Sequence, residues 1–274
     1  MRIRALVVLM LALSLASCAT TPITGRSRLR SPIPLETELQ LGVDAYAEAK
    51  SISELITSGL AFETVQLIGQ RVAVAAEQMI PEPTSAFDWE FILIDESETV
   101  NAWALPGGKT AVFTGLLTIA QDENGLAAII GHEIAHAVLQ HGIERMTQQT
   151  LLEGALGLAS VALGDMSASE RDATLQALSG LSSIGIALPF SRTHESEADE
   201  VGLYFAAAAG YDPRAAIGVW ERMADNSGDG APPEILSTHP SHDTRIADLQ
   251  QWMPTALEFY RSGDKELAAR LTPG

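Results

Sequence analysis

The segment 131–136 constrains this chain more than any other, because it has the sequence Gly-His-Glu-Ile-Ala-His within an apolar stretch. The surrounding pattern predicts a helix over residues 122–140, in which His132 and His136 lie one turn apart on the same face. Two imidazoles at that spacing can bind one zinc ion, and Glu133 lies close enough to reach a water on the metal. Imidazoles buried among apolar side chains need a metal or a polar partner. The segment therefore predicts a metal site on a buried helix.

A third protein ligand must come from elsewhere, because a catalytic zinc ion binds three protein ligands and keeps a fourth position for water. The remaining His residues are at positions 141, 194, 239 and 242. We expect His141 to face solvent, since five residues past His136 it lies roughly 140 degrees around the helix.

A carboxylate is the other candidate for the third ligand. The acidic segment 191–199 lies on a predicted helix over 192–209, where Glu195 and Asp199 share one face. Glu195 could bind the metal, and Asp199 could accept a hydrogen bond from the far nitrogen of a ligand His. Taken alone, the segment also fits a solvated charged face.

The rest of the chain predicts an α+β, predominantly helical fold, with a small three- to four-stranded sheet beside the helix that carries the two His. Apolar periodicity favours two helices between residues 35 and 79, split near Ser58-Gly59 and ended by Pro81 and Pro83. Three short strands are expected at 87–95, 100–105 and 110–114. Further helices are expected at 144–163, 169–183, 213–224, 242–252 and 254–261.

The N-terminus predicts a secretion signal and a lipid anchor. Two arginines precede about twelve apolar residues, which is the order of a signal peptide and is shorter than the roughly 20 residues of a spanning helix. Leu15-Ala16-Ser17-Cys18 resembles a bacterial lipobox, in which Cys18 becomes the lipidated first residue. Ala19 after it fits the pattern sent to the outer membrane of a two-membrane bacterium. The expected organisation is a signal peptide (1–17), lipidated Cys and tether (18–34), one domain (35–262) and a tail (263–274).

The charge balance argues against one class of partner. The chain has 17 basic and 35 acidic side chains, for a net charge of -18. Such a surface repels a phosphate backbone, so we expect no binding to nucleic acid. Cys18 is the sole cysteine, which excludes an internal disulfide.

Five motifs together resemble peptidase family M48, the gluzincin zinc metallopeptidases that include the HtpX heat-shock proteases, the CAAX prenyl proteases and short bacterial periplasmic lipoprotein proteases. The resemblance covers about residues 20–250. The motifs are Pro22-Ile23-Thr24-Gly25-Arg26, Asn101-Ala102-Trp103-Ala104-Leu105-Pro106-Gly107-Gly108, the His132–His136 core, Glu195-Ser196-Glu197-Ala198-Asp199, and Thr238-His239-Pro240 followed by Arg245-Ile246.

The resemblance implies a zincin-like domain with one Zn²⁺ and a set of site residues. It implies Glu195 as the third zinc ligand, which leaves Glu197 without that role, and Glu133 as the general base. His239 is implied to stabilise the developing oxyanion or to approach the zinc in a resting state, although it could simply enter a helix before Pro240. Arg245 could contact the site or serve as a structural ion-pair partner. The strand with Asn101, Ala102, Trp103 and Ala104 resembles a substrate-binding edge strand.

Two functions follow as hypotheses. The first is a zinc metalloendopeptidase that degrades unfolded or damaged cell-envelope proteins. It would be anchored through Cys18, on the periplasmic side of the outer membrane in a two-membrane host. The second is a chaperone-like assembly factor with latent proteolysis, which uses the same cleft to hold its clients. The presence of His132, Glu133, His136 and Glu195 favours the enzyme, because a pure binding protein has no need of a general base.

Overall fold

The structure is a computed structural model that describes residues 18–150, 191–225, 234–239 and 244–262. The predicted signal peptide, the predicted helix over 169–183, His242 and the predicted tail lie outside these ranges. The chain divides into two compact units, one with residues 1–34 and 143–188, the other with residues 35–142 and 189–274. The second unit contains every residue of the candidate metal site.

A four-stranded mixed sheet forms one side of the second unit. Its strands are β3 (Leu55–Ile56), β4 (Glu90–Ile94), β5 (Ala102–Leu105) and β6 (Lys109–Phe113), in the order β3-β4-β6-β5. β4 and β6 run parallel, and the two outer pairs are antiparallel. Gly107 and Gly108 both take a positive φ in the turn between β5 and β6, a conformation that favours glycine. The three predicted strands are confirmed, and β3 adds a fourth.

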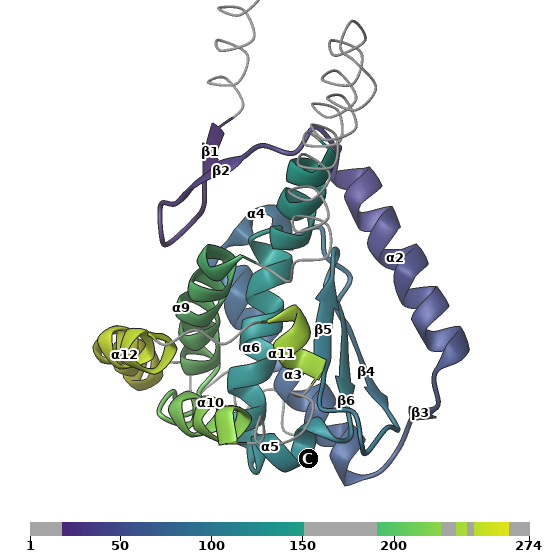
Figure 1. Ribbon diagram of the computed structural model, residues 1–274, viewed down its shortest axis with the longest axis vertical. Helices are drawn as coiled ribbons and strands as arrows, with labels where there is room; N and C mark the ends of the chain where they lie inside the picture. The colour runs from purple at the N-terminus through teal and green to yellow at the C-terminus, as the bar shows by residue number, and fades with distance from the viewer. Residues whose placement is uncertain (1–17, 151–190, 226–233, 240–243, 263–274) are drawn as a thin grey trace, which may run out of the picture. The chain divides into compact units, whose positions relative to one another are not determined.

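Helices cover this sheet and make up most of the unit (Figure 1). They are α2 (Leu35–Ile52), α3 (Leu60–Met79), α4 (Pro81–Thr84), α5 (Leu116–Ala120), α6 (Glu123–Val138), α9 (Arg192–Ala208), α10 (Ala215–Asp225), α11 (Glu234–Thr238) and α12 (Arg245–Ser262). The α+β, mainly helical prediction is therefore confirmed. The two helices expected at 242–252 and 254–261 are instead one, α12, which contains Pro254. One buried face that includes Leu249 and Ala256 keeps this helix continuous across the hydrogen bond that proline removes.

α6 lies at the centre of the unit, between α9 and the sheet side (Figure 1). Its side chains Ile130 and Ile134 are fully buried and join a core that includes Ile68 of α3, Leu93 of β4 and Phe205 of α9. Burial on nearly every side explains why this helix is apolar almost all round. Each polar side chain within it must therefore be satisfied inside the protein.

Side-chain caps fix where the two central helices begin. Asp122 accepts a hydrogen bond from the backbone N–H of Gly125 at the start of α6. Ser191 accepts one from the backbone N–H of His194 at the start of α9. Such caps contribute about 1 kcal/mol each and set the helical phase of the residues that follow.

The first unit contains a short hairpin where we expected a tether. β1 (Cys18–Thr20) pairs antiparallel with β2 (Ser27–Leu29). Arg26, which follows the turn, donates two hydrogen bonds to the carboxylate of Glu144, at 2.7 and 3.1 Å. The Pro22–Arg26 motif therefore forms the hairpin turn and an ion pair within this unit.

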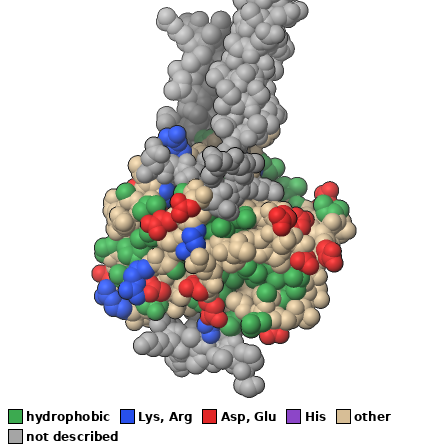
Figure 2. Space-filling model, turned by 60° about the horizontal axis from the view of Figure 1, so that its bottom comes forward, with side chains coloured by type: hydrophobic (Ala, Val, Ile, Leu, Met, Phe, Trp, Pro, Cys, Tyr) green, Lys and Arg blue, Asp and Glu red, His purple; other side chains and the backbone are tan. Residues whose placement is uncertain are grey.

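The described helices can be compared with a membrane-spanning helix, which needs about 20 mainly apolar residues. Among the residues that the structure describes, no helix combines the length and the apolar character needed to cross a bilayer. Acidic side chains are scattered among apolar ones over the face seen in Figure 2, as the composition predicts.

Candidate metal centre

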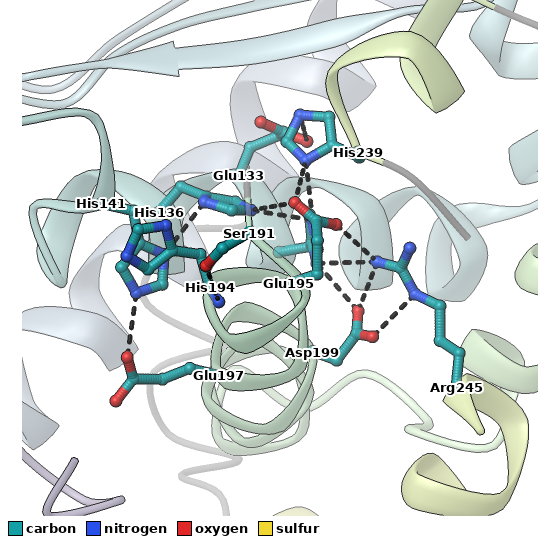
Figure 3. Close-up of polar contacts among 11 residues, drawn as sticks. Glu133, His136, His141, Ser191, His194, Glu195, Glu197, Asp199, His239 and Arg245 are labelled. Carbon is teal, nitrogen blue, oxygen red and sulfur yellow. Dashed lines mark hydrogen bonds and ion pairs between the residues drawn. The ribbon is translucent and has the colours of Figure 1, made fainter. Parts of the chain in front are cut away.

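Four predicted site residues meet at one buried point. α6 provides His132 and His136, α9 provides Glu195, and His239 follows α11 (Figure 3). All four side chains are buried, and one ligand atom from each lies within 4.8 Å of the other three. The structure therefore brings together side chains that are separated by up to 107 positions in the sequence.

The distances among these atoms match the edges of a zinc coordination shell. The Nε2 atoms of His132 and His136 are 3.1 Å apart, and they lie 3.5 and 3.4 Å from the carboxylate of Glu195. The Nδ1 atom of His239 lies 3.0 Å from Glu195 Oε1 and 3.2 Å from His132 Nε2. Ligands at zinc distances of about 2.0–2.1 Å stand roughly 3.3–3.4 Å apart in a tetrahedron. The residues present thus fit a zinc ion.

Asp199 lies against His132, at the ring nitrogen that points away from the other ligands. Its Oδ1 atom lies 2.9 Å from His132 Nδ1. A carboxylate only accepts hydrogen bonds, so Nδ1 carries a proton, and in the neutral, metal-binding form of His132 the lone pair is on Nε2 and faces the centre. When both rings are neutral, their Nε2 lone pairs face each other at 3.1 Å and repel, so a cation between His132 and His136 would relieve that repulsion.

Arg245 binds two of the carboxylates on α9. Its guanidinium donates to Asp199 at 2.7 Å and to Glu195 at 3.3 Å. The same group lies over the ring of Trp220, with 3.2 Å between Cζ and the ring centroid. Arg245 is 1% exposed, so its charge acts in a medium that screens it poorly. The structure places Arg245 in the site, behind the predicted ligands.

Glu133 lies on the far side of His239 from Arg245 (Figure 3). Its Oε1 atom is 3.6 Å from His239 Nε2 and has no hydrogen-bond partner among the described residues. Burial raises the pKa of this carboxyl. A buried carboxylate oxygen beside a metal site, with a raised pKa and no partner, is suited to accept a proton from a bound reactant.

The electrostatics of the cluster differ from group to group. Burial lowers the pKa of His136 well below its usual value. Burial acts the same way on His132, but hydrogen bonds to Asp199 and Glu195 outweigh it and raise the pKa to about 9. Burial would raise the pKa of Glu195, yet hydrogen bonds from three His side chains hold it far below the usual range. Glu195 is thus an anion and His136 a neutral base, the forms that bind a metal.

The expectation that His141 faces solvent is wrong. Its side chain is completely buried, and its Nδ1 atom lies 3.0 Å from His136 Nδ1. α6 ends at Val138, and Gln140 has a φ of 58°, so the helical path is interrupted before His141. The helical wheel that placed His141 on the outside does not extend past this turn. The Nε2 atom of His141 lies 3.0 Å from Glu197 Oε2. His141 and Glu197 are the two residues beside the metal cluster that the sequence interpretation missed.

The strand with Asn101–Ala104 lies at an edge of the sheet. Among the described strands, β5 pairs with β6 alone, and Asn101 directly before it is buried. The aromatic ring of Trp103 contacts Tyr46 edge-on. The edge position is confirmed, and substrate binding by these residues stays a prediction.

Comparisons with known proteins agree with this geometry. The chain is 35% identical over 241 residues to a Schizosaccharomyces pombe protein named mitochondrial metalloendopeptidase OMA1, covering 86% of the chain and 66% of the relative. It is 35% identical over 254 residues to the Bos taurus OMA1, covering 87% and 46%. It is 29% identical over 243 residues to the Escherichia coli β-barrel assembly-enhancing protease, covering 85% and 47%. The chain therefore spans about half to two thirds of the length of these relatives.

The family assignment rests on a longer match than any single motif. The model of peptidase family M48 matches residues 60–253, which is more than half of the chain and includes all four residues of the metal cluster. The chain belongs to peptidase family M48, a family of zinc metallopeptidases.

Proposed function

We propose that this protein is a zinc metalloendopeptidase, with one Zn²⁺ held by His132, His136 and Glu195. The observation that carries the proposal is the set of tetrahedral spacings among buried Nε2 and carboxylate atoms. Beside them lies a Glu133 oxygen that has no hydrogen-bond partner among the described residues. A bound zinc ion would polarise the scissile carbonyl and acidify a water molecule.

The residues of the chain then have separate roles. Glu133 accepts the proton of the attacking water and later delivers one to the leaving amine. Asp199 keeps His132 in its metal-binding tautomer, and Arg245 offsets the charges of Asp199 and Glu195. His239 lies within reach of the carbonyl oxygen of a peptide bound beside Glu133, where an imidazole N–H stabilises developing negative charge.

His239 also supports a closed resting state. Its Nδ1 atom lies at the fourth corner of the cluster, as close to Glu195 and His132 as those ligands are to each other. A substrate carbonyl needs that corner, so His239 has to withdraw before cleavage. His239 lies directly after the end of α11, and a residue at the end of an element can change its backbone angles in such a movement.

We propose unfolded or damaged cell-envelope proteins as substrates. β5 is an edge strand among the described residues, and an extended peptide can pair with its outer edge, with Asn101, Ala102, Trp103 and Ala104 as the contact residues. Folded proteins cannot offer their backbone in this way. Lipidation at Cys18 would hold the enzyme at a membrane, on the periplasmic side of the outer membrane in a two-membrane host. The name of the Escherichia coli relative connects that protein with β-barrel assembly.

A second candidate is a chaperone-like assembly factor with latent proteolysis. The observation that favours it is His239 at the fourth corner of the cluster, because a site closed in this way could hold clients without cleaving them.

Cleavage of unfolded casein by the full chain and by Glu133→Gln separates the two functions. The endopeptidase predicts that Glu133→Gln keeps its zinc and loses cleavage by about 10²–10⁴-fold. Glu123→Gln, an exposed change on the same helix, is the matched control and should cleave like the wild type. Zinc-loaded wild type that prevents aggregation of an unfolded client as well as Glu133→Gln does, and cleaves no better, would favour the assembly factor.

A further inference from the structure

A chain of hydrogen bonds runs from His136 to a carboxylate that no role above includes. His136 Nδ1 lies 3.0 Å from His141 Nδ1, and His141 Nε2 lies 3.0 Å from Glu197 Oε2 (Figure 3). His141 and Glu197 are both buried. Three buried polar groups in series need a consistent set of proton positions, and these can be worked out from the acceptor at the end.

The proton positions follow from Glu197. Its carboxylate only accepts, so His141 must donate from Nε2. Neutral His141 then has a lone pair on Nδ1, which can only accept, and the proton between the two rings belongs to His136 Nδ1. His136 is thereby left with a lone pair on Nε2, the atom that lies 3.1 Å from His132 Nε2 at the metal centre. The opposite arrangement would put a proton on that Nε2 and block metal binding.

We propose that His141 and Glu197 are positioning residues that fix His136 in its metal-binding tautomer. This inference rests on the proposed metal centre. The two His ligands then have carboxylate support of different lengths: Asp199 reaches His132 directly at 2.9 Å, and Glu197 acts on His136 through the imidazole of His141.

We call the hydrogen-bond chain from His136 through His141 to Glu197 the relay. Contacts around His141 hold the relay in place. The ring of His194 stacks on it, with centroids 4.6 Å apart and planes at 23°. The turn between α6 and His141 contains Gln140, whose side-chain amide donates to the buried carboxylate of Glu38 at 2.7 Å. A left-handed conformation at a residue other than glycine costs about 1–2 kcal/mol, so the turn is maintained by its contacts.

The test compares two substitutions of similar size at one position. His141→Gln can still accept from His136 with its carbonyl oxygen and donate to Glu197 with its N–H. His141→Leu fills the same space and can do neither. The measurement is the zinc dissociation constant of the full chain, by competition with a chromophoric chelator. Groups that orient metal ligands typically contribute about 10–100-fold to metal affinity, so we expect a loss of that size in His141→Leu and recovery of most of it in His141→Gln.

Glu197→Ala should weaken zinc binding as much as His141→Leu does. The double variant should lose no more zinc affinity than either single variant, because all three break the same relay. Thr84→Ala is the control for a buried hydrogen bond on a helix without site residues, and its zinc affinity should equal that of the wild type. A His141→Leu variant that binds zinc as tightly as the wild type would overturn the relay alone. A wild type without zinc would overturn the metal centre and the relay together.

A second measurement uses the wild-type protein alone. In the zinc-loaded wild type, long-range ¹H–¹⁵N correlation of His side chains should show His141 as the neutral tautomer protonated on Nε2, and His136 protonated on Nδ1. A His141 side chain that is protonated on Nδ1 would contradict the proposal, whatever the variants do.

Discussion

Gly131 of α6 and Gly202 of α9 lie in backbone contact. A Cβ atom added to Gly131 would lie 2.6 Å from the carbonyl oxygen of Gly202, and one added to Gly202 would lie 2.6 Å from the backbone nitrogen of His132. The two helices that carry His132, His136 and Glu195 therefore cross at a point where only glycine fits. This close approach sets the distance between the His pair and the carboxylate.

Gly202→Ala should separate the helices and weaken the metal site. Overpacking of this kind typically costs about 1–3 kcal/mol of unfolding free energy, and we expect weaker zinc binding as Glu195 moves away from the His pair. Gly142→Ala is the control, since its added methyl meets open space, and it should be neutral or slightly stabilising. Urea unfolding and zinc competition check both. Equal zinc affinity in Gly202→Ala and the wild type would show that the crossing does not set the site.

Zinc binding should release a proton from His132. In the metal-free protein this side chain has a pKa of about 9, so it is protonated at pH 7 and must lose that proton to bind the metal. Zinc affinity should therefore rise with pH up to about 9 and then level off. The folded pKa is above the usual 6.5, so the protonated ring stabilises the metal-free protein below pH 6.5, and this stabilisation is lost as the pH rises towards 9.

Calorimetric titration with zinc in buffers of different ionisation enthalpy measures the protons released. We expect a number close to one at pH 7 and close to zero well above pH 9. A zinc affinity that does not change between pH 6.5 and 9 would show that His132 is already neutral without metal.

Arg245→Met should destabilise the metal-free protein more than the zinc-loaded protein. The change leaves Asp199 and Glu195 buried without their counter-charge, and breaking a buried ion pair in this way costs about 3–5 kcal/mol. Bound zinc would offset part of that negative charge, so the loss should be smaller in zinc-loaded protein. Thermal unfolding with and without a chelator checks the difference. Arg245→Lys keeps the charge and should be intermediate, and an equal loss in both metal states would contradict the assigned role.

Away from the site, an ion pair between Lys109 and Glu90 should make the stability of the sheet depend on acid pH. The hydrogen bond from Lys109 is the main cause that lowers the pKa of Glu90, at an ion-pair distance of 2.7 Å. A lowered folded pKa gives stability that is present above the normal value near 4.5 and is lost as the pH falls through the folded value. Because Glu90 is 44% exposed, we expect Glu90→Gln to lose only about 0.2–1 kcal/mol at pH 7. The difference should vanish by pH 3, and a difference that persists there would exclude the ion pair as its source.

The sequence predicted the parts of the site that depend on helical spacing. His132 and His136 are placed by the periodicity of one helix, and Glu195 and Asp199 by that of another, so local geometry was enough to give each pair a common face. The meeting of the two helices was supplied by the resemblance to the family, because a contact between glycines 71 positions apart leaves no local pattern.

The sequence interpretation failed where the chain leaves a regular element. His141 was placed by extending a helix that in fact ends at Val138, and Pro254 was taken as a boundary inside a helix that packing keeps continuous. β3 was missed because two residues are too few to show alternation. In each case contacts with distant residues decide the conformation, as the hydrogen bond from Gln140 to Glu38 does for the turn before His141.

The central claim is that His132, His136 and Glu195 hold one zinc ion. Metal analysis of the full chain after dialysis against a weak chelator, beside His136→Ala and Glu195→Ala, tests it most directly. We predict about one zinc per chain in the wild type and little or none in either variant, because the centre needs three protein ligands. A wild type without zinc, or variants that retain it at the wild-type level, would contradict the account.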